Sequence, residues 1–224
     1  MTAPPVVRLS PDGRELDSLL GPQVRLLGVS GSPGAGKSTL AAALALRLGG
    51  RVVPMDGFHY ADVELRRRGL LARKGAPETF DAEGYAALLA RVRERRAGEA
   101  PVVAPAFERD LEQPLAGAVA VPDEAHEETG LVVTEGNYLL LDEPRWAAVR
   151  TPLDAVWHVV VDEPLRRGRL LARHEAYGKS AADAAAWVAS VDDPNAVLVE
   201  GVRHRADLVL DLTAWSPAGG SGLP

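Results

Sequence analysis

The stretch of sequence that decides the fold is Gly31-Ser32-Pro33-Gly34-Ala35-Gly36-Lys37-Ser38. It matches the pattern G-x-x-x-x-G-K-[ST] in full, and its glycines let the backbone turn so tightly that its N–H groups point into one concavity. Such a concavity binds phosphate oxygens, and the dipole of a following helix adds to the attraction. The alternative is a glycine-rich turn that binds nothing, which the complete pattern disfavours.

The residues on either side of this loop predict a strand before it and a helix after it. Residues 25–30 are short and apolar, as in a buried parallel strand, and the alanine- and leucine-rich run at 40–48 favours a helix that Gly49 and Gly50 end. Similar patterns predict further strands at 51–55, 131–134, 155–161 and 207–212, a hairpin or edge strands at 101–107 and 117–121, and helices after residue 11 and at 62–71, 83–97, 164–177 and 180–190.

Alternating strands and helices imply a parallel sheet that is covered by helices on both faces. Together with the phosphate loop, this order predicts an α/β fold of the P-loop NTPase type, with three α/β/α layers, a mainly parallel sheet and a helical lid at about 163–190. We expect one domain over residues 1–215 and a flexible tail at 216–224, which is rich in Pro, Gly and Ser. The acidic insert at 121–130 suggests only a surface loop.

Composition narrows the class of protein. The chain has 224 residues, 46% of them hydrophobic, and a formal charge of -6, which argues against nucleic acid as a partner. It has no cysteine, which excludes disulfides and thiolate catalysis. No leader-like start or membrane-length apolar run is visible, so we expect a cytoplasmic protein without a membrane partner. The sequence leaves monomer and homodimer open.

The phosphate loop itself predicts ATP and Mg²⁺ as cofactors. Lys37 is expected to reach the β- and γ-phosphates, Ser38 to bind Mg²⁺ through its hydroxyl, and Thr39 to contact the α-phosphate or cap the helix. The residues of this stretch predicted to bind the nucleotide are Gly31, Ser32, Pro33, Gly34, Ala35, Gly36, Lys37, Ser38 and Thr39.

Two acidic residues follow predicted strands and are therefore expected at the carboxyl edge of the sheet, where ligands of such sheets bind. Asp56 fits a base that orients an acceptor hydroxyl and takes its proton, and the alternative is a cap on the next helix. Glu135 fits a Mg²⁺-associated carboxylate, and the alternative is a structural role. We also include Asp56 among the candidate metal ligands, because the two acids need not divide the work in this way.

The predicted helix after residues 155–161 carries Arg166, Arg169 and Arg173 with i, i+3, i+7 spacing, so these side chains share one face. Guanidinium groups suit the charge of a transferring phosphoryl group, and such a helix can close over ATP. The alternative is an ordinary solvated face. We predict Asp56, Lys37, Arg169 and Arg173 as catalytic residues and add Arg166 to the nucleotide-binding set.

These motifs together resemble the P-loop kinases of the uridine kinase, phosphoribulokinase and bacterial pantothenate kinase group, in particular a bacterial branch of nucleoside/nucleotide or fructose-transport-system kinases. The resemblance extends over about residues 26–210. It rests on GSPGAGKST, VPMDGFHY, RRRGLLARKGAPETFD, APAFERDLEQP, TEGNYLLLDEPRW, VDEPLRRGRLLARHEAYGKS and DDPNAVLV. The branch tends to have FDR where this chain has Phe107-Glu108-Arg109, so the match there is loose.

The resemblance implies roles for particular positions. Asp56 corresponds to the catalytic base and Glu135 to the magnesium-associated acid, while Asn195 lies where the group approaches the adenine. Residues 73–81 resemble a segment that helps to build the acceptor pocket. His59 is either a substrate contact or a structural histidine beside a turn. The residues predicted to bind the acceptor are Asp56, His59, Tyr60, Arg73, Phe80, Phe107, Arg109, Glu135 and Tyr138.

The leading hypothesis is an ATP-dependent kinase whose acceptor is the hydroxyl of a nucleoside, a sugar or a pantothenate-like alcohol. A nucleotide-dependent switch is disfavoured, because the sequence lacks the Asn-Lys-x-Asp motif that reads guanine. A non-catalytic nucleotide-binding regulator derived from a kinase is the remaining alternative, and intact Lys37, Asp56 and Glu135 argue against it.

Overall fold

A six-stranded parallel sheet forms the centre of the protein, with the strand order β1–β8–β7–β2–β6–β3. The computed structural model describes residues 3–96, 98–121 and 130–217. The phosphate loop follows the central strand β2, so two strands lie on one side of it and three on the other. The strands are β1 (Val6–Arg8), β2 (Leu26–Gly31), β3 (Arg51–Pro54), β6 (Val132–Gly136), β7 (Ala155–Val160) and β8 (Leu208–Asp211).

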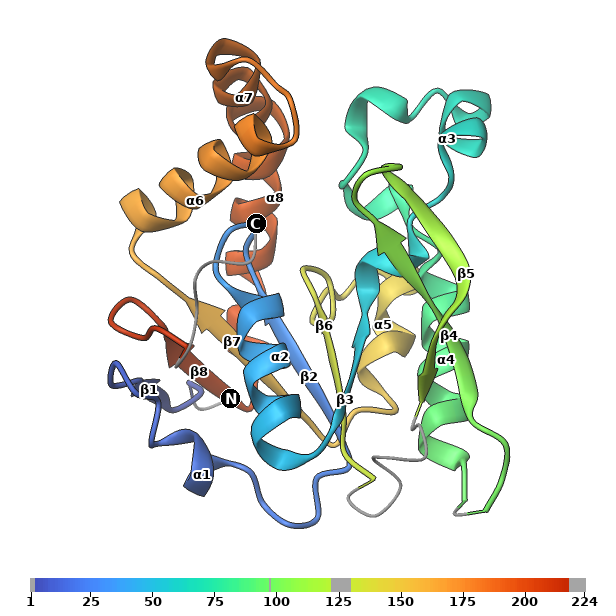
Figure 1. Cartoon of the computed structure of the whole chain (residues 1–224), viewed down its shortest axis with the longest axis vertical. Helices are drawn as coiled ribbons and strands as arrows, with labels where there is room; N and C mark the ends of the chain where they lie inside the picture. Colours follow the sequence, from blue (N-terminus) through green and yellow to red (C-terminus); the bar gives the residue numbers. More distant parts are fainter. Residues whose placement is uncertain (1–2, 97, 122–129, 218–224) are drawn as a thin grey trace.

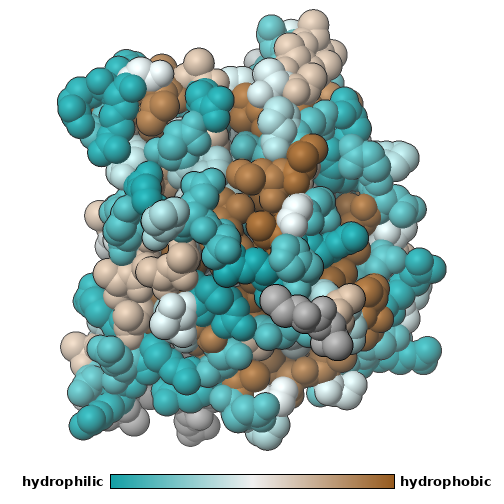
Figure 2. Space-filling view, turned by 180° about the vertical axis from the view of Figure 1, so that it is seen from behind, coloured by the Kyte–Doolittle hydropathy of each residue, from teal (hydrophilic) through white to brown (hydrophobic). Residues whose placement is uncertain are grey.

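Helices cover both faces of this sheet, which confirms the predicted three-layer α/β/α fold of the P-loop NTPase type (Figure 1). One face packs against α1 (Leu16–Leu19) and α2 (Lys37–Leu48). The other packs against α4 (Ala82–Glu94), α5 (Pro144–Arg150) and α8 (Asp193–Gly201). On that second face, hydrophobic side chains also gather at the surface near the middle (Figure 2).

Two groups of elements project beyond the carboxyl edge of the sheet (Figure 1). One comprises α6 (Glu163–Ala176), α7 (Ala181–Trp187) and a π-helical turn (Val188–Asp192), and we call these the lid. The other comprises α3 (Asp62–Arg68) and the turn end of the antiparallel hairpin of β4 (Val102–Glu108) and β5 (Gln113–Val121), whose remaining length runs beside the sheet (Figure 1). Short 3₁₀ turns at Met55–Phe58, Leu71–Arg73, Pro77–Thr79 and Arg203–Arg205 link these parts. No helix of the described residues is long and apolar enough to cross a membrane.

The predicted strands and most predicted helices are present, but three elements were missed. Strand β1 and helix α5 have no long periodic pattern, and α8 begins where the predicted helix at 180–190 should have ended. Instead of ending, the chain passes through the π-helical turn into α8. The predicted helix at 62–71 ends early, at Arg68, because Gly69 adopts a left-handed conformation with φ of 70°. Residues 122–129 of the acidic insert and 218–224 of the tail lie outside the described residues.

A buried chain of hydrogen bonds ties helix α4 to the two strands that lead into the carboxyl edge. The Thr134 hydroxyl donates to the carbonyl of Val53 on β3 at 2.7 Å. Because its only hydrogen is used there, the hydroxyl of Tyr85 on α4 is the donor in the 2.5 Å bond to Thr134 Oγ1. Both side chains are fully buried. This series of hydrogen bonds therefore holds β3 and β6 together next to Glu135.

We predict that Tyr85→Phe lowers the free energy of unfolding by about 1 kcal/mol, because it removes one buried donor and leaves no group strained. Thr134→Val should cost about 2–3 kcal/mol, because the buried Tyr85 hydroxyl then lacks its partner. Urea denaturation measures both values. The control is Tyr177→Phe, whose hydroxyl is on an exposed residue. A loss for Tyr85→Phe no larger than that of the control would contradict the prediction.

Candidate active site

The phosphate loop is shaped by glycines that no other residue can replace without displacing its neighbours. Gly34 has a φ of 80°, and a β-carbon there would lie 2.7 Å from the carbonyl oxygen of Arg166. At Gly31, with a φ of 154°, a β-carbon would lie 2.6 Å from the carbonyl oxygen of Val159. The loop is thus pressed against the end of β7 and the start of the lid, and both close approaches need glycine.

Lys37 is the buried cation of this loop. The residue is 8% exposed, and its ammonium group donates to the carbonyl oxygen of Ser32 at 3.1 Å. Burial lowers the pKa of Lys37 to about 8, although the nearby carboxylates of Glu135 and Asp56 oppose this change. The charged amine therefore lies in a poorly solvated place, where it attracts an anion more strongly than it would in water.

Asp56 and Glu135 come from the ends of two neighbouring strands. Pro54 at the end of β3 is paired with Glu135 on β6, and Asp56 follows within the 3₁₀ turn that continues β3. Ser38, the second residue of α2, donates through its hydroxyl to Glu135 Oε1 at 3.1 Å. The structure therefore brings together the loop, the lysine and the two predicted acids.

The surroundings shift the pKa values of these two carboxyls in opposite directions. Burial raises the pKa of Glu135 to about 7, and the negative charge of Asp56 adds to this effect. Burial alone would also raise the pKa of Asp56, but the neighbouring basic groups, His59 and Arg109 first, outweigh it and hold the pKa of Asp56 below its ordinary value. Asp56 is therefore an ionised carboxylate that can accept a proton, whereas at Glu135 burial and the charge of Asp56 outweigh the opposing effect of Lys37.

The pairing of the Ser38 hydroxyl with the Glu135 carboxyl, whose pKa is raised, fits a divalent cation. The described residues contain no group of three or more His, Cys, Asp and Glu side chains arranged as a metal cluster. A carboxylate and a hydroxyl, however, suit Mg²⁺, which keeps several waters and takes its other ligands from a bound nucleotide. Positive charge beside Ser38 and Glu135 would stabilise the ionised form of Glu135.

A second group of side chains surrounds Asp56 on the side of the hairpin. Arg109 donates to Asp56 Oδ2 at 2.7 Å, and its guanidinium group lies 5.0 Å from the centre of the Phe107 ring. His59 stacks between Phe107 and Phe80, with ring centroids 4.9 and 3.9 Å away. Its Nδ1 donates to the carbonyl of Asp56 at 2.8 Å, and burial lowers its pKa. His59 thus supports the turn that carries Asp56.

Two of the predicted acceptor contacts are too deeply buried to contact a substrate. Phe80 is 1% exposed and packs edge-on against Trp146, and Tyr138 is 0% exposed. The hydroxyl of Tyr138 donates to the carbonyl of Gly75 at 2.5 Å. These two side chains support the segment at 73–81. The sequence did not reveal this, because aromatic residues that line a pocket and those that lie behind its wall have the same local sequence context.

Two other predicted contacts lie at the outer edge of the same region. Arg73 donates through Nε to Glu78 at 2.5 Å, and the Tyr60 hydroxyl accepts from Arg145 at 3.1 Å. The sequence analysis did not single out Lys74, which follows Arg73 in the chain. Its ammonium group is 5.3 Å from the centre of the Phe107 ring and donates to Asp62 at 2.8 Å.

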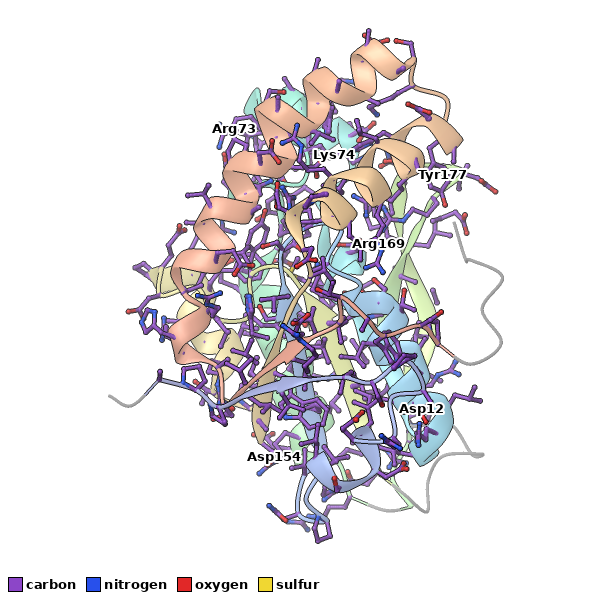
Figure 3. The ribbon with its side chains drawn as sticks, turned by 90° about the vertical axis from the view of Figure 1, so that its left-hand side faces the viewer. Asp12, Arg73, Lys74, Asp154, Arg169 and Tyr177 are labelled. Carbon is purple, nitrogen blue, oxygen red and sulfur yellow. The ribbon has the colours of Figure 1, made fainter. Side chains whose placement is uncertain are left out.

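The three predicted lid arginines do different things. Arg166 is 5% exposed, and its guanidinium group is bound to Glu163, to Asp193 and to the carbonyl of Pro33, so its donors are engaged by the protein itself. It secures the loop to the lid, and its predicted place in the nucleotide-binding set stays a prediction. Arg169 projects from α6 towards the start of α2 (Figure 3), where its Nη1 would lie 3.3 Å from a β-carbon at Gly36.

Arg173 lies one turn further along α6 and is close enough to Lys37 and Asp56 to act on both electrostatically. Burial lowers the pKa of Arg169. Within the part of the chain that the structure describes, neither Arg169 nor Arg173 has a carboxylate partner in an ion pair, in contrast to Arg166. Both are therefore available to an anion at the loop.

Helix α8 and the turn before it contribute residues that sequence reasoning placed differently or missed. Asn195 donates to the carbonyl of Gly75 at 3.3 Å, so its side chain contacts the segment at 73–81. Asp192 is 6% exposed, accepts from His174 Nε2 at 2.8 Å and is an electrostatic neighbour of Lys37. No spacing in the sequence links His174 to Asp192, since the lid must fold before they meet.

A glycine-built phosphate loop, a buried lysine and two carboxylates at adjacent strand ends together define a P-loop phosphotransferase. No family model matches the chain. The chain is 32% identical over 181 residues to a candidate uridine kinase of Schizosaccharomyces pombe, a match that covers 76% of this chain and 74% of that protein. It is also 32% identical over 151 residues to a pantothenate kinase of Limosilactobacillus reuteri, covering 61% of this chain and 44% of that protein.

A solved structure gives the same answer. The crystal structure of a candidate fructose transport system kinase from Silicibacter sp. TM1040 superposes with a TM-score of 0.71 at 37% identity, covering 85% of this chain and 92% of that one. The chain belongs to the P-loop kinase family of the uridine kinase-like proteins and pantothenate kinases, which confirms the family that its motifs predict.

The raised pKa of Glu135 leads to a prediction about stability. Between about pH 4.5 and 7 the folded protein keeps a proton on Glu135 that the unfolded chain releases, so stability falls as pH rises through this window. Glu135→Gln cannot ionise, yet its carbonyl oxygen still accepts from Ser38. The variant should therefore exceed the wild type in free energy of unfolding at pH 8 by on the order of 3 kcal/mol, and by little at pH 5.

Urea denaturation of the nucleotide-free protein in EDTA, at both pH values, measures this difference. Glu143→Gln is the matched control, because it makes the same change on an exposed residue. An advantage of Glu135→Gln that is the same at pH 5 and pH 8 would show that Glu135 is ionised throughout.

Proposed function

We propose that this P-loop kinase transfers the γ-phosphoryl group of ATP to the hydroxyl of a small alcohol, with Asp56 as the base. The observation that carries the proposal is the opposite pKa shift of two carboxyls beside a buried lysine. One carboxylate is kept ionised by basic neighbours, and burial raises the pKa of the other to about 7. Pairs of acids whose surroundings separate their pKa values in this way divide a reaction between them.

Asp56 would orient the acceptor hydroxyl and accept its proton as the oxygen attacks phosphorus. Its bond to Arg109 leaves one carboxylate oxygen, Oδ1, for the incoming hydroxyl. The bond also keeps the carboxylate in one orientation, which matters because phosphoryl transfer depends mainly on positioning and on charge. Arg109 itself would contact the acceptor on its other side, against the Phe107 ring.

Charge on the phosphates would be neutralised from three directions. Lys37 would leave the carbonyl of Ser32 for the β- and γ-phosphates, and Arg169 and Arg173 would approach from the lid. Ser38 and Glu135 would hold Mg²⁺, which supplies charge neutralisation between the phosphates when bound. The loop amides and Thr39 would complete the binding of the triphosphate at the start of α2.

The acceptor class remains a nucleoside, a sugar or a pantothenate-like alcohol. The wall beside Asp56 combines the Phe107 ring with the cations of Arg109 and Lys74, so it presents a flat apolar surface edged by donors. Such a wall favours an acceptor with a planar or apolar face and acceptor groups along its rim. A non-catalytic regulator would have no use for an ionised Asp56 held in place by an arginine.

The test is ADP release from Mg-ATP with a panel of nucleosides, ketoses, aldoses, pantothenate and nicotinamide riboside. Asp56→Asn should keep the affinity for Mg-ATP within about threefold and lower kcat with the productive acceptor by about 10²–10⁴-fold, since the amide cannot take a proton. Lys37→Ala should lose nucleotide binding and turnover together.

Normal turnover by Asp56→Asn would remove Asp56 from the role of base. ATP binding without acceptor-dependent ADP release, across the panel and for the wild type, would favour the regulator. A stability measurement on each variant separates loss of activity from loss of fold.

A further inference from the structure

An open pocket of about 570 Å³ lies beside the phosphate loop. It is lined by loop residues Ser32 and Ala35, by the end of β7 and by the facing sides of α6 and α8. At this pocket the loop is held partly by polar contacts from the neighbouring helices.

One of these polar contacts is a three-residue network at the end of α8. The Ser32 hydroxyl donates to Glu200 Oε1 at 2.6 Å, and His158 Nε2 donates to the same oxygen at 3.2 Å. Ser32 is 2% exposed, and His158, on β7, is 0% exposed. A carboxylate oxygen thus joins the second residue of the loop to the strand beside it.

The contacts of His158 indicate that its role is to position the Glu200 carboxylate. His158 Nδ1 has no hydrogen-bond partner among the described residues, so the only polar contact of this buried ring is Glu200. A buried histidine with one unpaired nitrogen is a costly residue for a strand interior, where an aliphatic side chain would pack without penalty. Its presence is explained if the position of the Glu200 carboxylate matters.

Ser32 is also the residue to which Lys37 is bound. Its carbonyl accepts from the Lys37 ammonium group, while its hydroxyl is held by Glu200. A displacement of Ser32 therefore moves both the loop backbone and the resting position of the lysine. Burial raises the pKa of Glu200, but its bonds to His158 and Ser32 outweigh burial and leave the pKa below its ordinary value, so the carboxylate is ionised and acts as an acceptor.

We propose that Glu200 is a positioning residue for the nucleotide: from helix α8 it holds Ser32, and with it the phosphate loop, in the conformation that binds the triphosphate. The proposal rests on the proposed function only in that the ligand is Mg-ATP. Glu200 is not expected to contact the phosphates, and its negative charge by itself opposes their binding. Its value lies in the geometry that it imposes on Ser32.

The hydrogen bond from Ser32 to Glu200 should strengthen nucleotide binding, whereas the negative charge of Glu200 should weaken it. Substitutions can separate these two effects. Glu200→Ala removes the acceptor and the charge, and should weaken the binding of Mg-AMP-PNP, measured by calorimetry, about tenfold. Glu200→Gln keeps a carbonyl oxygen that accepts from Ser32 and His158 but removes the charge, so it should bind at least as tightly as the wild type. Ser32→Ala should resemble Glu200→Ala, and the double variant should be no weaker than either single variant.

The matched control is Arg203→Ala, which removes the exposed partner of Glu200 at 3.7 Å and leaves the Ser32 bond intact. It should bind Mg-AMP-PNP within about twofold of the wild type. For Glu200→Ala with a productive acceptor, KM for ATP should rise while kcat stays within about threefold, because the base and the metal ligands are untouched.

Wild-type affinity in Glu200→Ala would overturn the proposal, as would a Glu200→Gln variant as weak as Glu200→Ala. If Glu200→Ala fails to fold, Ser32→Ala and Glu200→Gln carry the same test. The binding measurement needs no acceptor, so a wild type that binds Mg-AMP-PNP but phosphorylates nothing in the panel would contradict the proposed function and leave this inference standing.

Discussion

The arrangement of the site depends on one electrostatic constraint, the burial of the Lys37 ammonium group among groups of limited polarity. A buried amine needs negative charge or carbonyl oxygens nearby, and here it has the carbonyl of Ser32 with Glu135 and Asp56 as electrostatic neighbours. The same burial that depresses the pKa of Lys37 raises that of Glu135. A bound nucleotide would therefore favour the charged form of Lys37, and its metal ion would favour the charged form of Glu135.

Parallel strand geometry brings these groups together without any one of them being specified locally. The loop leaves β2, Glu135 lies on the adjacent β6, and Asp56 follows β3, the next strand out. All three strands end at the same edge, so side chains distant in sequence converge there. The buried bonds from Tyr85 to Thr134 and from Thr134 to Val53 then hold the two acid-bearing strands at a fixed spacing. Catalytic geometry is in this sense a consequence of sheet register.

Sequence reasoning located the polar residues that follow a strand end, but it could not resolve contacts that depend on tertiary structure. The loop, Asp56 and Glu135 could be predicted because apolar runs locate the strands and the polar residues come directly after them. Arg166 could not be separated from Arg169 and Arg173, because all three share one helix face and only the contacts with Asp193 and the Pro33 carbonyl set it apart. The predicted acceptor contacts of Phe80 and Tyr138 were wrong for a related reason. The local sequence pattern does not show how deeply a side chain is buried.

Helix α8 shows most clearly what local pattern omits. It is nine residues long, yet Asp193 binds Arg166 of the lid, Asn195 binds the carbonyl of Gly75 in the segment at 73–81, and Glu200 binds Ser32 in the loop. Its buried face, with Ala196 and Val199, packs on the sheet and restricts how far the helix can shift. The π-helical turn at the end of the lid continues directly into α8. A helix with these three attachments gives the phosphate loop and the segment at 73–81 a common support.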